Sequence, residues 1–158
     1  MKRRTFLQTT VAAGLLAAAG VSSLIESAAA LAAARPADAF AARSEADVVR
    51  ALFGDLTATL SKAVRIIDPP YQAMRGIGVP FSMACDLGGI ETIAVVTRNN
   101  RRPLNTVISL SGADGYYHTR IKVEQSSPVT VYVKAAGKLY SASTLVKVTG
   151  GGYGMYLP

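Results

Sequence analysis

Apolar residues recur at every second position over short stretches of this chain between Val79 and Val148. Successive side chains of a β-strand point to opposite faces, so this alternation predicts strands that bury one face and expose the other. A helix would need apolar residues three or four positions apart. Most of the chain is therefore expected to be β-structure. The residues predicted to form the apolar strand faces are Val79, Phe81, Met83, Cys85, Leu104, Thr106, Ile108, Leu110, Tyr117, Thr119, Ile121, Val123, Val129, Val131, Val133, Tyr140, Ala142, Thr144, Val146 and Val148.

The predicted strands follow one another at short and regular intervals. Residues 90–97 are apolar on both faces, which is typical of a central strand. Ala136-Gly137-Lys138 is expected to turn a hairpin between the last two strands. About seven such strands within about 90 residues predict an all-β fold, an immunoglobulin-like β-sandwich. We expect the strands at residues 62–67, 79–85, 90–97, 104–110, 116–124, 129–133 and 140–148.

One short N-terminal helix is predicted from Glu45 to Phe53. Ser44 is a suitable N-cap residue, and Asp47 near the first turn complements the positive end of the helix dipole. Gly54 is expected to end the helix. The alanine-rich residues 35–43 before it are interpreted as a linker, so that the folded domain spans residues 44–149.

The N-terminus is predicted to carry an export signal. Residues 2–8, KRRTFLQ, resemble the twin-arginine signal, with Arg3 and Arg4 followed by Phe6 and Leu7 in the expected places. The apolar stretch at 11–21 is too short for a membrane span, which needs about 20 residues. Small-residue cleavage sites follow. We therefore expect residues 1–34 to be a signal peptide, with the cleavage site left open up to residue 41, and the mature protein to be periplasmic.

Composition excludes several functional classes. The net charge is +7, but Arg101-Arg102 is the single tight basic pair after the leader, and no basic stripe with interleaved aromatic residues predicts nucleic-acid binding. The chain has one histidine and one cysteine and no clustered carboxylates, so neither a metal site nor an intramolecular disulfide is expected. We predict no catalytic residue, no cofactor and no enzymatic activity.

Cys85 and His118 are the two side chains considered as candidates for a chemical role. Cys85 shares a predicted strand face with Phe81 and Met83, which favours a buried and unreactive thiol. A reactive thiol would need exposure and a positive neighbour, whereas Asp86 follows Cys85. His118 lies on a predicted polar face, where a lone histidine is usually a surface residue. A triad assembled in space around it stays open at this point.

The C-terminal residues 150–158 are predicted to form a flexible arm. Gly150, Gly151, Gly152 and Gly154 surround Tyr153, and such a run of glycines is costly to hold in one shape. The segment after the glycines is apolar and aromatic, which suits either a disordered tail or insertion into a groove of a partner.

Taken in order, these segments resemble SoxY, the sulfur-carrier subunit of the periplasmic thiosulfate-oxidising system. The resemblance covers about Ala46 to Gly154. It is carried by ALFG at 51–54, IDP at 67–69, VP at 79–80, IETIAVV at 90–96, RPL at 102–104, TRIK at 119–122, GKLYSA at 137–142 and VKVT at 146–149, which leads into the glycine arm.

The resemblance implies a specific role for the arm. The family arm ends in Gly-Gly-Cys-Gly-Gly, and its cysteine holds the sulfur substrate covalently while the arm moves between partner enzymes. In this chain Gly151, Gly152, Tyr153 and Gly154 occupy that place, so Tyr153 stands where the cysteine is expected. A phenol does not form the persulfide or thiosulfonate bond. The resemblance also implies a heterodimer with a SoxZ-like subunit and contacts with other sulfur-oxidation enzymes.

We therefore expect an exported, non-enzymatic SoxY-like protein of thiosulfate oxidation that has lost covalent sulfur attachment and acts as a partner or scaffold. Two alternatives stay open at this stage. One is a redox or sulfur-binding protein that uses Cys85, and the other is an unrelated immunoglobulin-like binding module.

Overall fold

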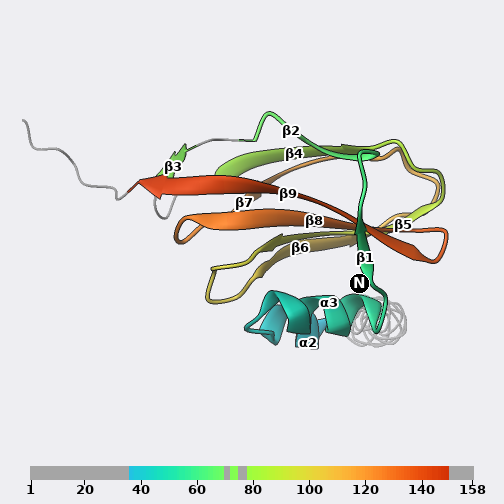
Figure 1. Ribbon diagram of the computed structural model, residues 1–158, viewed down its shortest axis with the longest axis horizontal. Helices are drawn as coiled ribbons and strands as arrows, with labels where there is room; N and C mark the ends of the chain where they lie inside the picture. The colour runs from blue at the N-terminus through green and yellow to red at the C-terminus, as the bar shows by residue number, and fades with distance from the viewer. Residues whose placement is uncertain (1–35, 70–71, 75–77, 150–158) are drawn as a thin grey trace, which may run out of the picture. The chain divides into compact units, whose positions relative to one another are not determined.

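The computed structural model describes residues 36–69, 72–74 and 78–149, the backbone alone at 72–74. Every described helix and strand lies in one compact unit that begins at Ala37 (Figure 1). The predicted all-β sandwich is confirmed, with nine strands and two short helices in the described ranges. The elements are α2 Ala37–Ala41, α3 Glu45–Phe53, β1 Ala58–Leu60, β2 Val64–Ile67, β3 Gln72–Met74, β4 Val79–Cys85, β5 Ile90–Thr97, β6 Leu104–Ser109, β7 Tyr116–Ile121, β8 Ser127–Ala135 and β9 Lys138–Thr149.

The strands form two sheets that face each other. The larger sheet has the order β1-β9-β8-β5-β6, and the smaller has the order β2-β4-β7. β5 lies between β8 and β6, so the prediction that it is central is confirmed. β9 is antiparallel to β8 on one edge and parallel to both β1 and β3 on the other. β9, the longest strand, is thus paired with other strands along both of its edges.

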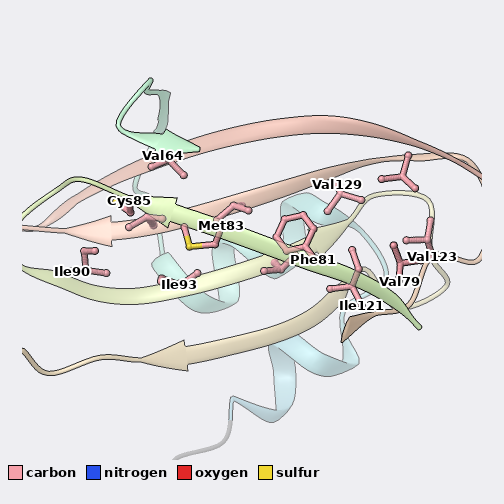
Figure 2. Close-up of a cluster of buried hydrophobic side chains, with 14 of the residues drawn as sticks. Val64, Val79, Phe81, Met83, Cys85, Ile90, Ile93, Ile121, Val123 and Val129 are labelled. Atoms are coloured by element: carbon pink, nitrogen blue, oxygen red, sulfur yellow. The ribbon is translucent and has the colours of Figure 1, made fainter. Parts of the chain in front are cut away.

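The main core lies between the two sheets (Figure 2). β4 alternates strictly, with Val79, Phe81, Met83 and Cys85 buried and the residues between them more exposed. Val129, Val131 and Val133 of β8, which belongs to the opposite sheet, are also fully buried. The predicted inward faces of these two strands are confirmed, because each side chain meets its counterpart across the layer rather than water.

A second cluster covers the other face of the larger sheet. Val48 and Phe53 of α3 and Ala39 of α2 pack with Ala94 and Val96 of β5. β5 is therefore apolar on both faces because the smaller sheet covers one face and the helices cover the other.

The linker prediction for residues 35–43 is wrong over residues 37–41, which form helix α2. Ala39 is fully buried against the second cluster, and Phe40 is partly buried beside it. An alanine-rich segment forms helix readily once one face of it is covered by other residues. The sequence pattern alone contains too few large apolar residues to indicate that burial.

The ends of α3 agree with the prediction. The helix runs from Glu45 to Phe53, the Ser44 Oγ accepts from the Asp47 backbone N–H at 3.1 Å, and Gly54 follows with a φ of 64°. The hairpin between β8 and β9 is also confirmed, since Ala136 and Gly137 both have positive φ, as a tight turn of this kind requires.

The face assignment for β6 is wrong at Leu104. The β5–β6 register shifts between Val95 and Val96, because Val95 pairs with Thr106 whereas Val96 pairs with Leu104. Asn105 is the extra residue, and a bulge of one residue reverses the faces that follow it. Leu104 consequently packs in the helix-side cluster, whereas Ile108 and Leu110 pack against the main core.

Candidate functional site

The base of the predicted arm is held firmly. Val146 of β9 pairs with Ser127, and the Val148 backbone N–H donates to the Ser126 Oγ at 3.0 Å. On the opposite edge, β3 pairs with residues 147–149. The strand is therefore fixed up to Thr149. The predicted arm residues Gly151, Gly152, Tyr153 and Gly154 lie outside the described residues.

The twin-arginine residues Arg3, Arg4, Phe6 and Leu7 also lie outside the described residues, so the export signal stays a prediction. No helix among the described residues is long and apolar enough to span a membrane.

Cys85 is buried in the main core and has only 7% of its surface exposed. It is the last residue of β4, pairs with Val64 of β2, and donates its backbone N–H to the Gly115 carbonyl oxygen at 2.6 Å. Figure 2 shows Cys85 near Ile90 at one end of the core, with Val79 and Val123 at the other end. Ile90 pairs with Ala135, beside the β8–β9 hairpin, so Cys85 lies at the end of the sandwich away from the arm base.

His118 lies on the outer, exposed face of β7. Its Nδ1 is 2.8 Å from the Ser82 Oγ of β4, so one hydroxyl and one imidazole are hydrogen-bonded. A nucleophile–base–carboxylate arrangement would also need an acidic group on the other ring nitrogen. Within the described ranges no carboxylate bonds His118, and no group of three metal-ligating side chains is present. The pair has the geometry of a surface hydrogen bond.

The fold brings together one set of charges that sequence reasoning missed. Arg43, Arg101, Arg102 and Lys122 line one groove together with Glu124. These residues come from the segment between the helices, the β5–β6 turn and the connection after β7. Arg101-Arg102 is visible in the sequence as a basic pair, but its neighbours lie far away along the chain, and only the tertiary structure places them beside it.

Glu124 is the acidic member of this cluster. Its carboxylate bonds the Lys122 Nζ at 2.8 Å and the Arg101 backbone N–H at 2.9 Å. The hydrogen bond from Lys122, followed by that from Arg101, holds the pKa of Glu124 below its usual range. The carboxylate therefore stays ionised and neutralises one of the four nearby cations.

Comparison with known proteins identifies the family. The family described as "Sulfur oxidation protein SoxY" matches residues 49–152 of this chain. The chain belongs to the SoxY family. The match runs from within α3 through β9 and includes Gly151 and Gly152, and it ends directly before Tyr153.

A solved structure agrees with the SoxY assignment. The sulfur carrier protein SoxY from Chlorobium limicola f thiosulfatophilum is 31% identical over 66% of this chain and 94% of its own, with a TM-score of 0.60. A superoxide reductase (neelaredoxin) from Ignicoccus hospitalis shows 12% identity and a TM-score of 0.48 over 55% of this chain and 80% of its own. No match was found among curated proteins. The SoxY match argues against the unrelated binding module.

Proposed function

We propose that this chain is an exported, non-enzymatic SoxY-type subunit of thiosulfate oxidation that has lost covalent sulfur attachment. The observation that carries the proposal is the family match over residues 49–152, supported by the 31% identity to a SoxY sulfur carrier. The match begins within α3 and includes all nine described strands and the start of the predicted arm.

The loss of attachment follows from the chemistry of two residues. A carrier arm needs a thiolate that forms a bond to sulfur, and Tyr153 offers a phenol at that place. The one cysteine of the chain, Cys85, is in the core at the end away from the arm base. Its sulfur is therefore shielded from a partner enzyme that would load it. A scaffold or partner role requires the sandwich surface and not the thiol.

The proposed partner is a SoxZ-like β-sandwich subunit. The edges of the smaller sheet are β2 and β7, and β6 is an edge of the larger sheet. Such edges carry unpaired backbone groups that another chain can cover. Co-expression of this chain with a SoxZ-like protein from the same genome is expected to yield a stable complex on affinity purification and gel filtration. Separate elution of both proteins at micromolar concentration would contradict the partnership.

Sulfur attachment is tested by restoring a thiol on the arm. The native chain, Tyr153→Cys and Tyr153→Ser are incubated with thiosulfate, the loading enzymes of a SoxY system and their electron acceptor, and intact masses are measured. We expect an adduct on Tyr153→Cys, and none on the native chain or on the serine control. An adduct on Cys85 of the native chain would reject this proposal in favour of the alternative, a protein that binds sulfur through Cys85.

A further inference from the structure

A basic groove lies where three chain segments meet beside the β5–β6 turn. It encloses about 650 Å³, a volume within the range of small-molecule sites. Leu104, which is 6% exposed, contributes an apolar part of the lining. The polar lining residues are Arg43, Asn100, Arg101, Arg102, Asn105, Lys122 and Glu124.

The groove has an excess of positive charge. Lys122 is neutralised by Glu124, which leaves the guanidinium groups of Arg43, Arg101 and Arg102. Arg102 uses one nitrogen to donate to the Phe40 carbonyl oxygen at 3.1 Å. Among the described residues, the side chains of Arg43 and Arg101 form no hydrogen bond or ion pair, so their donors face the groove or solvent.

Two asparagines hold the frame of the groove rigid. Asn100 is 6% exposed; its Nδ2 donates to the Lys122 carbonyl oxygen at 2.6 Å, and its Oδ1 accepts from the Glu124 backbone N–H at 2.9 Å. Asn105, the bulge residue, accepts from the Lys122 backbone N–H at 3.0 Å and donates to the Thr97 Oγ1 at 2.7 Å. The β5–β6 turn and the segment after β7 are therefore locked together, which fixes the backbone that carries Arg101, Arg102 and Lys122.

We propose that this groove binds a small sulfur oxyanion, sulfate or thiosulfate, between the guanidinium groups of Arg43 and Arg101. Guanidinium groups bind two oxygens of a tetrahedral dianion at once, and a concave, preorganised setting reduces the cost of ordering them. A concave groove of this size suits a small molecule or ion rather than the broad surface of a protein or nucleic acid, and the cationic lining favours an anion. The geometry supports a dianion by itself, whereas the choice of sulfur rests on the proposed function.

The groove lies at the same end of the sandwich as the arm base. The Asn99 Nδ2 donates to the Ser126 carbonyl oxygen at 2.8 Å, and the Ser126 Oγ accepts from the Val148 backbone N–H. The turn that carries Arg101 is therefore linked through Ser126 to the last residues of β9. A bound sulfur oxyanion would be held at the end of the domain where the arm begins.

The test is a titration of the full chain followed by NMR, at constant ionic strength and with sodium chloride as the reference. Sulfate, thiosulfate and phosphate are compared, with the Arg101 backbone amide and the Asn100 and Asn105 side-chain amides as reporters. We expect saturable chemical-shift changes with sulfate or thiosulfate, and a dissociation constant for one of them no larger than that for phosphate. Phosphate binding clearly tighter than both would overturn the sulfur assignment.

Matched double variants separate a built site from diffuse charge. Arg43→Gln with Arg101→Gln is expected to weaken binding about tenfold or more, because charge-assisted hydrogen bonds are lost. Lys62→Gln with Lys138→Gln removes the same charge from exposed positions outside the groove and is expected to leave the affinity unchanged. Glu124→Gln is expected to tighten binding.

Equal weakening by both double variants, or shifts that never saturate, would overturn the site. Neither outcome bears on sulfur attachment, which is tested separately. The melting temperature of each variant checks that it is folded.

Discussion

At the scale of single residues, the contact between Gly115 and Cys85 shows how tightly the chain is packed where β4 ends. A Cβ placed on Gly115 would lie 2.0 Å from the Cys85 carbonyl oxygen and 2.9 Å from the Ile90 Cδ1. The obstacle is mainly backbone, which cannot move aside as a flexible side chain would. Glycine is therefore required here for close approach of two chain segments.

Gly115→Ala is accordingly expected to destabilise the domain by about 1–3 kcal/mol, the usual cost of overpacking. Urea unfolding followed by circular dichroism measures it. Gly88→Ala is the control, because nothing lies within 4 Å of a Cβ at that exposed position. The control is expected to change stability by less than about 1 kcal/mol. Equal stability of the two variants would mean that the segment before β7 does not approach Cys85 this closely.

At the scale of elements, helix α3 is joined to the larger sheet by a polar contact beside its apolar one. The Glu45 carboxylate accepts from the Tyr132 hydroxyl of β8 at 2.9 Å and also from the Arg98 Nε. The Tyr132 ring lies 6.3 Å from the Phe53 ring, between centroids. Both ends of the helix are thus anchored to one strand residue. Partial burial, followed by the bond to Glu45, raises the pKa of Tyr132.

Tyr132→Phe removes the hydroxyl while keeping the ring, and is expected to cost about 1–2 kcal/mol of stability near pH 7. The folded-state pKa of Tyr132 is raised, so this contribution is complete below the unfolded-state value of about 10 and is lost as pH rises above it. The difference between the native chain and the variant should therefore shrink in alkaline buffer. Chemical unfolding at several pH values measures this.

Tyr116→Phe is the matched control, because Tyr116 is 60% exposed on the outer face of β7. Its effect should stay within about 0.5 kcal/mol. A Tyr132→Phe variant as stable as this control would show that the hydroxyl bond to Glu45 contributes nothing in solution.

At the scale of the whole molecule, the folded unit is stabilised by two apolar clusters and no disulfide, since the chain has one cysteine. Such a domain folds without any oxidising compartment. This independence is compatible with the twin-arginine route, which carries folded cargo. The export signal predicted at Arg3 and Arg4 and the folded unit are thus consistent with each other.

Replacing Arg3 and Arg4 together by lysine is expected to leave uncleaved precursor in the cytoplasm. Cell fractionation and immunoblotting measure the distribution. The same substitution at Arg101 and Arg102, the basic pair of the folded unit, is the control and should leave export unchanged. Normal export of the first variant would reject the twin-arginine prediction.

Local sequence was sufficient for the features that depend on neighbours along the chain. Alternation placed the inward faces of β4 and β8, and Ser44 with Gly54 marked the ends of α3. The resemblance to SoxY was also legible without a structure, and the family match over residues 49–152 confirms it. These features are encoded within a few residues, because side-chain direction and capping follow from backbone geometry.

Tertiary structure decided the features that depend on distant partners. β1 and β3 are three residues each, carry no alternation of their own, and exist through parallel pairing with β9. The bulge at Asn105 reversed the face of Leu104, and burial of Ala39 turned a predicted linker into α2. The basic groove likewise formed only when the two sheets packed together and hydrogen bonds from Asn100 and Asn105 held Lys122 beside the β5–β6 turn. Each of these features depends on contacts between residues that are far apart in the sequence. A local pattern of side chains does not indicate such contacts.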